Sequence, residues 1–545
     1  MIRSCFVTFS VFAAATALQA KPAIYLHQVI NAASYYAPGQ PGGSIAQGSL
    51  VSIFGTALGP QQGISQTSFP LTNSFSGVSI TVTQGSTTVN AIPVYVSAGQ
   101  INAIMPSNAP LGWSSMVVSY NGTSNPSPVY IVHDSPGIFT FTGTGIGPAA
   151  LQNAQNDGSL VLNSYQVSAT PGQTEQMYLT GLGPISAADN QAPPSGTLST
   201  PVEVWVGGVS ASVTYSGRSP CCSGLDQIDF VIPANAPQGC WVPVYVRTSH
   251  STVSNFTSLA ISANGGACSD PSNSLSAAVQ SGGSLGTVSL MRMAVHEDVG
   301  VNAPVDVSDD FATYSALNVP SAPYTFVPFV SAPPAGTCTV YPGTGDFLQS
   351  GTVPEASPPA LDGGKQLTIS GPGGQKSVTM TGTAAPLGSY LPLYSLPNQL
   401  YLSPGTYSVG TSGGVNVPAF TTSVTVPPAL SWTNRDQITA VDRTQALTLN
   451  WSGAVSGQPV EILGVGSDLP TNSSAVFFCV VPAGATSFSV PPQVLSALPG
   501  ARTNPLASKD VIYLMTTSGS SFSASGLSTA VTSGGYIAGK TVTFQ

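Results

Sequence analysis

Apolar and polar residues alternate along most of this chain. Val78, Ile80 and Val82 stand at every second position, and the same period appears in Val202/Val204/Val206, Leu447/Leu449/Trp451 and Val542/Phe544. Such alternation predicts β-strands with one face toward a core. The runs are short and are separated by turns rich in the chain's 58 Gly and 47 Pro residues. We therefore predict an all-β protein, with little helix.

Two sequence anchors occur twice in the first half, in the same order. Gln100–Gly112 returns as Gln227–Gly239, and Gly48–Pro60 aligns with Gly172–Pro184. In the first anchor, Gln-Ile-x-x-Ile/Val indicates a strand, and Asn-Ala-Pro-x-Gly indicates the turn that follows it. The repeat predicts tandem Ig-like β-sandwich modules at 21–134 and 135–263.

The second half has weaker punctuation. Residues 264–286 are rich in Ser, Gly and Ala, which is typical of a linker, and strand-like runs follow. A boundary is predicted after Pro427-Pro428. This gives a linker plus β-rich module at 264–428 and a further β-sandwich at 429–545. Pairing of Cys338 with Cys479 would place that boundary inside a cross-linked unit.

Charge excludes several functions. Only 6% of residues are charged, against about 25% in a typical soluble domain, and the net charge is −9. The chain has no clustered basic face for nucleic acid and no polybasic patch for membranes. After the N-terminal segment, no run reaches the length of a membrane span.

Residues 1–20 are predicted to be a signal peptide. Arg3 supplies the positive end, Cys5–Leu18 is mostly apolar, and Ala20 offers a small residue at the cleavage site. The protein is therefore expected to be exported, and either secreted or held at the cell surface.

The six cysteines that follow are expected to form disulfides, because their number is even and the chain is exported. Sequence alone leaves 15 connectivities open. Our interpretation pairs Cys221 and Cys222 outward with Cys240 and Cys268, in either order, since a bridge between adjacent cysteines would be strained. Cys338 and Cys479 then pair with each other. Zinc is disfavoured, because Cys221-Cys222 lacks the spacing of a ligand pair.

Several further segments add a family resemblance. Asn31–Ser34 and Ile45–Gly55 begin the match, and Gln100–Pro106, Pro136–Phe139, Asn156–Ser159 and Tyr178–Gly183 continue it. Residues 29–263 resemble a family of uncharacterised exported acidobacterial proteins with tandem Ig-like modules of the IPT/TIG kind. The resemblance implies an Ig-like fold and secreted or surface placement. It implies no activity, and it says little about 264–545.

The densest acidic cluster is a calcium candidate. His296-Glu297-Asp298 is followed by Asp306, Asp309 and Asp310, and hard cations prefer carboxylate oxygens. The cluster lacks the spacing and the Gly of an EF-hand loop, so a solvated loop is the preferred interpretation. No cofactor is predicted.

Two motifs suggest catalysis but lack its context. Gly410–Gly414 matches G-x-S-x-G, yet no His follows His296 and a strand-like run comes next, so we predict a hairpin turn. Gly145–Ala150 resembles a dinucleotide loop, but Pro148 and the β-rich surroundings favour a plain glycine-rich loop.

Carbohydrate chemistry could use acids or aromatics. Asp226/Asp229 and Glu297/Asp298 are conceivable carboxylate pairs for glycoside hydrolysis. Trp113, Trp205 and Trp241 could form a sugar-stacking platform, although buried aromatics are commoner. Structural roles are preferred for both sets.

The leading hypothesis is a non-catalytic binding, adhesion or scaffold protein whose partner is an unknown extracellular protein or polysaccharide. The alternative is a carbohydrate-binding or carbohydrate-active protein. Exposed aromatics in a row on one sheet would favour carbohydrate binding, and two carboxylates facing across a cleft would favour hydrolysis.

Overall fold

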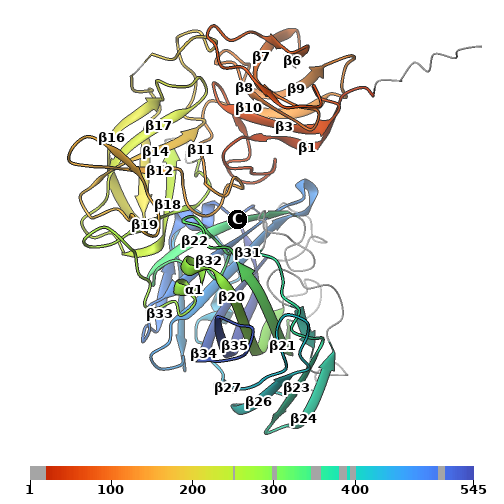
Figure 1. The fold of residues 1–545 in the computed structure, drawn as a ribbon, viewed down its shortest axis with the longest axis vertical. Coiled ribbons are helices and arrows are strands. Elements are labelled where there is room, and N and C mark those ends of the chain that lie inside the picture. The colour runs from red at the N-terminus through yellow and green to blue at the C-terminus, as the bar shows by residue number, and fades with distance from the viewer. Residues whose placement is uncertain are drawn as a thin grey trace, which may run out of the picture.

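The computed structural model describes residues 20–194, 196–248, 252–297, 304–344, 358–379, 389–392, 400–500 and 510–545. The predicted signal peptide therefore lies outside the described residues, apart from Ala20. Two β-sandwiches of Ig-like type precede a larger β-rich C-terminal unit (Figure 1). In the described ranges, helix is confined to α1 (Ser276–Ser281), α2 (Pro492–Ser496) and the 3-10 turns η1 (Arg435–Gln437) and η2 (Leu469–Thr471). The predicted all-β class is confirmed.

Module 1 is a sheet folded over its own core. The first half of β7 pairs with β6 and its second half pairs with β8, so β7 passes from one layer to the other. Ile80, Val82 and Met116 are fully buried between the layers. The strands are β1 (Ala23–Asn31), β2 (Ile45–Ala46), β3 (Leu50–Thr56), β4 (Ile64–Ser65), β5 (Ser74–Phe75), β6 (Val78–Gln84), β7 (Thr87–Val96), β8 (Gln100–Ile104), β9 (Gly112–Ser119) and β10 (Ser127–Val132).

Module 2 repeats this design. Its long strand β16 pairs with β15 and then with β17, as β7 does with β6 and β8. The strands are β11 (Gly137–Ile138), β12 (Leu151–Ala154), β13 (Leu160–Leu162), β14 (Thr174–Thr180), β15 (Val202–Val206), β16 (Val209–Arg218), β17 (Asp226–Val231), β18 (Gly239–Thr248) and β19 (Thr257–Ile261).

One side-chain device occurs in both modules. The side-chain amide of Asn125 accepts a hydrogen bond from the Ile24 N–H and donates one to the Ile24 carbonyl. The amide of Asn255 makes the same two hydrogen bonds with Ile138. Each Asn thereby satisfies backbone groups of the entering strand that would otherwise be unpaired. The device aligns β10 with β19, and it adds a structural match to the repeated sequence anchors.

The C-terminal unit corrects the predicted boundary at 428/429. β20 (Gly283–Glu297), which precedes the boundary, pairs in parallel with β35 (Thr529–Phe544), which follows it. β22 (Thr337–Thr344) likewise pairs with β32 (Ser473–Val481). One nine-stranded sheet thus joins the two predicted modules. Alternation shows which face of a strand is apolar, but it does not identify a partner strand far away in sequence.

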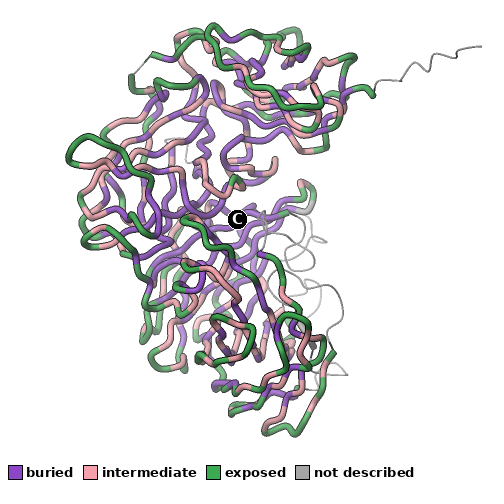
Figure 2. The backbone as a smooth tube through the Cα atoms, viewed as in Figure 1, coloured by how far each residue is buried: buried purple, intermediate pink, exposed green. Residues whose placement is uncertain are grey.

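Two smaller sheets cover one face of this large sheet. The four-stranded sheet packs Tyr407 and Val409 onto Val288 and Leu290, and the three-stranded sheet contributes Trp451 to a neighbouring core. The remaining strands are β21 (Val305–Val319), β23 (Gln366–Gly371), β24 (Gly374–Thr379), β25 (Ser389–Pro392), β26 (Gly405–Thr411), β27 (Thr421–Val426), β28 (Ser431–Trp432), β29 (Ala440–Val441), β30 (Leu447–Ser452), β31 (Val460–Asp468), β33 (Ser487–Val490) and β34 (Asp510–Phe522). Figure 2 shows the buried positions concentrated in the middle of the molecule, with exposed positions toward its edges and loops.

The structure forms three disulfides, and one of the predictions for them is wrong. Cys338 pairs with Cys479 as predicted, but Cys240 pairs with Cys268 and Cys221 pairs with its neighbour Cys222. The outward pairing of Cys221 and Cys222 fails because they lie in the turn between β16 and β17. Cys240 is the second residue of β18, and Cys268 follows β19, which pairs with β18, so these two cysteines lie close together.

The two modules and the C-terminal unit contact one another directly. Thr180 of module 2 accepts a hydrogen bond from the Leu50 N–H of module 1 at 2.8 Å. Trp241 of module 2 shares a buried cluster with Tyr341 and Phe478 of the C-terminal unit. Gln40 of module 1 is buried and donates to the carbonyls of Gly343 (3.1 Å) and Ser474 (2.8 Å) in the C-terminal unit.

Gly39 provides a test of this docking. Its φ of +104° disfavours any side chain, and a Cβ here would overlap the side chain of Thr471. We expect Gly39→Val to weaken the contact between module 1 and the C-terminal unit by about 3 kcal/mol, because it adds backbone strain and breaks the hydrogen bonds of Gln40. Small-angle X-ray scattering should then show a larger radius of gyration. The control is Gly172→Val, which carries similar backbone strain (φ +86°) with open space around its Cβ; equal expansion in both variants would contradict the assigned contact.

A second test concerns a carboxyl in the core of module 2. Glu175 is fully buried on β14, and neither carboxylate oxygen has a hydrogen-bond partner among the described residues. The matching position in module 1 is the buried Val51. Desolvation raises the pKa of Glu175 well above its ordinary value, so folding favours the protonated form.

The raised pKa of Glu175 makes the stability of the protein depend on pH. The stabilising protonated form is fully available below the unfolded-state pKa, and stability falls as the pH rises from there toward the higher folded-state pKa. Glu175→Val should therefore raise the free energy of unfolding by about 2 kcal/mol at neutral pH, and it should flatten the pH dependence. Urea denaturation at acidic and neutral pH measures both effects, and Glu175→Gln separates charge from polarity. An unchanged pH slope in Glu175→Val would contradict this assignment.

Candidate binding surface

Asp226 and Asp229, which the sequence leaves open as a carboxylate pair, are not brought together. Asp226 is buried in an ion pair with Arg218 (2.6 Å) and also accepts from the Leu182 N–H. Burial raises the pKa of Asp226, and Arg218 acts against that rise. Asp229 points to the other face of β17 and accepts from Gln227. Asp226 thus has a structural role. In the other pair, Asp298 lies outside the described residues.

The calcium candidates do not converge either. They lie on the extended strand β21, not in the predicted loop, so Asp309 points away from Asp306 and Asp310. Asp310 is buried and accepts from Arg292 (2.7 and 3.0 Å) and from the backbone of Tyr401 and Leu402.

Asp306 contacts His296 (3.0 Å) and Arg435 (3.5 Å). Both contacts are made by the same carboxylate oxygen, and the Asp306 side chain is otherwise exposed. Across the part of the chain that the structure describes, no group of three or more His, Cys, Asp or Glu side chains could hold a metal ion.

The G-x-S-x-G segment spans the end of β26 and the loop leading to β27, which pairs with β26 antiparallel. A nucleophile elbow would need a helix after the motif. The predicted turn fits this geometry better. Gly145–Ala150 is likewise a loop that leads into β12.

The three tryptophans have different environments. Trp241 is buried and donates to the hydroxyl of Tyr165, and Trp205 is half-buried and stacked on Tyr245. Trp113, in contrast, is 66% exposed. The preference for buried aromatics is thus right for Trp241 and wrong for Trp113.

Trp113 and Tyr130 form an exposed aromatic pair, which we call the aromatic platform. They are cross-strand neighbours on β9 and β10, and their ring centroids lie 5.1 Å apart. Tyr130 is 44% exposed. The neighbouring Ser114 and Met116 side chains are buried, so the alternation of β9 directs Trp113 outward. Gln84 steadies this corner by donating to the carbonyls of Leu111 (2.9 Å) and Trp113 (3.1 Å).

The platform lies on an almost uncharged module. Between residues 21 and 134 the charged residues are Lys21 and Asp134. Asp134 is buried and contacts His133. The platform therefore offers apolar ring faces surrounded by neutral hydrogen-bonding groups. Large exposed apolar groups of this kind mark interaction sites more often than isolated exposed aliphatics do.

The repeat shows what this face does in module 2. The positions of Trp113 and Tyr130 correspond to Cys240 and Ala260, which are both 2% exposed and packed against the C-terminal unit. On the same face, Tyr245 and Phe256 enter a core shared with the C-terminal unit. This face is therefore a contact face in module 2. In module 1 the aromatic pair at the matching place remains exposed.

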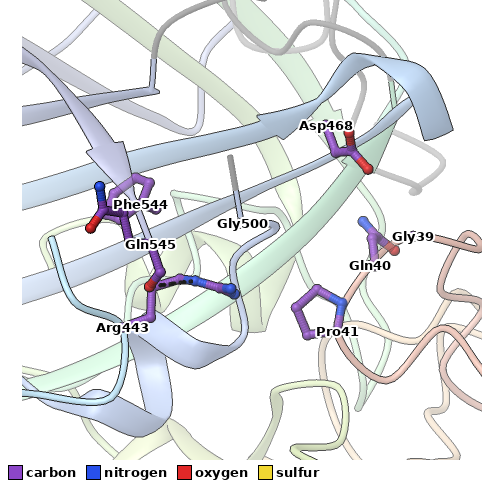
Figure 3. A pocket seen from close by; sticks show the side chains of 8 residues that line it. All are labelled: Gly39, Gln40, Pro41, Arg443, Asp468, Gly500, Phe544 and Gln545. Atoms are coloured by element: carbon purple, nitrogen blue, oxygen red, sulfur yellow. Dashed lines mark hydrogen bonds between the residues drawn. The ribbon is translucent and has the colours of Figure 1, made fainter. Parts of the chain in front are cut away.

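A separate hollow of about 360 Å³ lies between module 1 and the C-terminal unit (Figure 3). Its polar groups are already engaged with the protein: Arg443 donates to the carbonyls of Leu498 (2.6 Å) and Gln545 (3.3 Å), and Asp468 accepts from Thr471 (2.7 Å). We interpret this hollow as part of the junction between the two bodies.

Comparisons with known proteins add little. No family model and no curated protein matches the chain. Among solved structures, the chain is similar to dimeric latent PorU from Porphyromonas gingivalis (12% identity, 74% of this chain and 33% of that chain, TM-score 0.17). It is also similar to the titin I-band fragment I67–I69 (7% identity, 70% and 97%, TM-score 0.10).

A third similarity is to the Bacteroides ovatus glucan-utilization protein SGBP-B in complex with a mixed-linkage heptasaccharide (10% identity, 88% and 96%, TM-score 0.13). The chain spans about a third of the PorU chain. Scores this low carry no argument about function. Among the described residues, no helix is long and apolar enough to cross a membrane.

Proposed function

We propose that this chain is an exported, non-catalytic binding protein that attaches to neutral polysaccharide through the aromatic platform of module 1. The exposed Trp113–Tyr130 pair carries the proposal. Three disulfides support placement in an oxidising compartment outside the cytoplasm.

The chemistry of the platform suits a sugar ring. A pyranose with equatorial hydroxyls has an apolar C–H face and a rim of hydroxyls. Trp and Tyr supply large, rigid, amphipathic contact area at a small cost in side-chain entropy. The near absence of charge in module 1 favours an uncharged ligand over a polyanion, which basic side chains would attract.

The interlocked body adds a scaffolding role. Module 1 is joined to module 2 by a partly buried hydrogen bond and to the C-terminal unit by a buried one, so the platform has a fixed orientation. A preorganised surface binds with a smaller entropy penalty than one on a flexible linker. Module 2 and the C-terminal unit would then hold a bound partner at a fixed position relative to the polysaccharide.

The test is affinity electrophoresis through gels containing neutral polysaccharides, among them hydroxyethylcellulose, xyloglucan and galactomannan, with alginate as a polyanion. We expect retardation in at least one neutral gel, no retardation in alginate, and normal migration of Trp113→Ala. The matched control is Leu160→Ala, which removes an exposed apolar side chain from module 2. Equal retardation of wild type and Trp113→Ala in every gel would overturn the proposal.

A further inference from the structure

Beside the aromatic platform, the outer face of module 1 carries rows of neutral polar side chains. In the first row Ser115 on β9 lies opposite Thr83 on β6, and Thr83 lies opposite Thr88 on β7. The Thr83 and Thr88 hydroxyls are 2.9 Å apart. The next row contains Thr81 and Asn90, with the apolar Val117 of β9 on the other side of Thr81. We call these five residues the hydroxyl strip.

The strip and the platform face the same way. Val82 and Met116, which alternate with strip residues, are fully buried in the core of module 1, so the strip residues point outward. Ser115 is two residues from Trp113 on the same strand, which places it about 7 Å from the platform along β9. From there the strip crosses two more strands, each about 5 Å from the last. An aromatic anchor thus continues into a solvent-facing side of the sheet that carries hydroxyl and amide groups.

We infer that the ligand is an extended polysaccharide chain, bound along the strip by several consecutive sugars, and not a single sugar or a chain end. This inference rests on the proposed function and goes further by naming the form of the ligand. Binding a chain end requires a walled pocket, whereas an open sheet face accepts a chain that passes across it. Hydroxyl side chains both donate and accept, so they match the hydroxyl rim of neighbouring sugars.

The hydroxyl strip is part of the binding site only if it adds affinity beyond that of the platform. A disaccharide can cover the platform alone, so its affinity should depend on Trp113 and not on Thr83 or Thr88. A hexasaccharide can also reach the strip. With two or more added hydrogen bonds, we expect it to bind about tenfold more tightly than the disaccharide.

Isothermal titration of the full chain with cellobiose and cellohexaose tests this. We expect the roughly tenfold gain for cellohexaose in wild type, and its loss in the double variant Thr83→Ala/Thr88→Ala, with cellobiose affinity unchanged. The matched control is Thr406→Ala/Thr425→Ala, which removes a similar exposed cross-strand threonine pair (3.2 Å) from the C-terminal unit. This control should keep the gain.

The failures are distinguishable. Equal affinity of wild type for cellobiose and cellohexaose, or an undiminished gain in Thr83→Ala/Thr88→Ala, would overturn the strip while leaving the platform intact. Binding of neither oligosaccharide would also overturn it, and is the result expected if a protein partner occupies this face. Failure of the proposed function itself appears separately, as equal retardation of wild type and Trp113→Ala in the polysaccharide gels.

Discussion

The double variant Cys338→Ala/Cys479→Ala is expected to lose about 4 kcal/mol of stability in the C-terminal unit. These cysteines lie directly opposite each other on β22 and β32 and close a loop with a sequence separation of 141 residues. A cross-link that closes so long a loop removes much of the entropy of the unfolded chain. In sequence, β22 precedes the strands of the four-stranded sheet and β32 follows them. The disulfide therefore links the two parts of the large sheet that this segment separates.

Urea denaturation, followed by near-UV circular dichroism, measures this loss. The matched control is Cys221→Ala/Cys222→Ala, because the bridge between adjacent residues closes no loop of consequence and both residues are exposed. We expect the control to change stability by less than about 0.5 kcal/mol. Equal losses in the two double variants would contradict the assignment of loop closure to Cys338–Cys479.

The second large effect is on binding. Trp113→Ala should weaken binding of a neutral polysaccharide about 30-fold, equivalent to about 2 kcal/mol, which is the range of an aromatic hot spot. Tyr130→Ala should have a smaller effect, because Tyr130 is less exposed and lies against Trp113. Trp113→Phe should recover part of the affinity, since it keeps an apolar ring at the same place.

Circular dichroism and thermal unfolding of Trp113→Ala should match wild type, because the exposed side chain contributes little to the core. Isothermal titration then gives the ratio of dissociation constants. A reduction smaller than about threefold in the correctly folded variant would be inconsistent with a platform that anchors the ligand.

The sequence predicts the β class and the internal repeat because both depend on local pattern. Alternation at Val78, Ile80 and Val82 places these side chains in the core, and the Gln-Ile and Asn-Ala-Pro-x-Gly anchors recur at matching strands β8 and β17. The pairing of Cys338 with Cys479 follows by elimination, even though its companion prediction for Cys221 and Cys222 is wrong.

What the sequence could not supply is long-range pairing and exposure. Nothing local in β20 indicates that it lies beside β35, so the boundary at 428/429 could not be excluded. The Asp306–Asp310 cluster resembles a loop until β21 is seen to continue through it.

The exposure of Trp113 could be known only from the fold. Trp113 and Trp241 both lie in β-strands, but only Trp241 is buried, because module 2 packs against the C-terminal unit there. One sequence signal could have found the platform: Trp113 stands in phase with Ser115, and Tyr130 stands between the apolar Val129 and Ile131, in a module with two charged residues.

The most direct measurement is acrylamide quenching of tryptophan fluorescence with and without saturating polysaccharide. The chain has five tryptophans; Trp241, Trp432 and Trp451 are buried, Trp205 is half-buried, and Trp113 is the widely exposed one. We expect bound polysaccharide to lower the quenchable fraction of the fluorescence in wild type and not in Trp113→Ala. Polysaccharide that binds wild type while leaving quenching unchanged would contradict it.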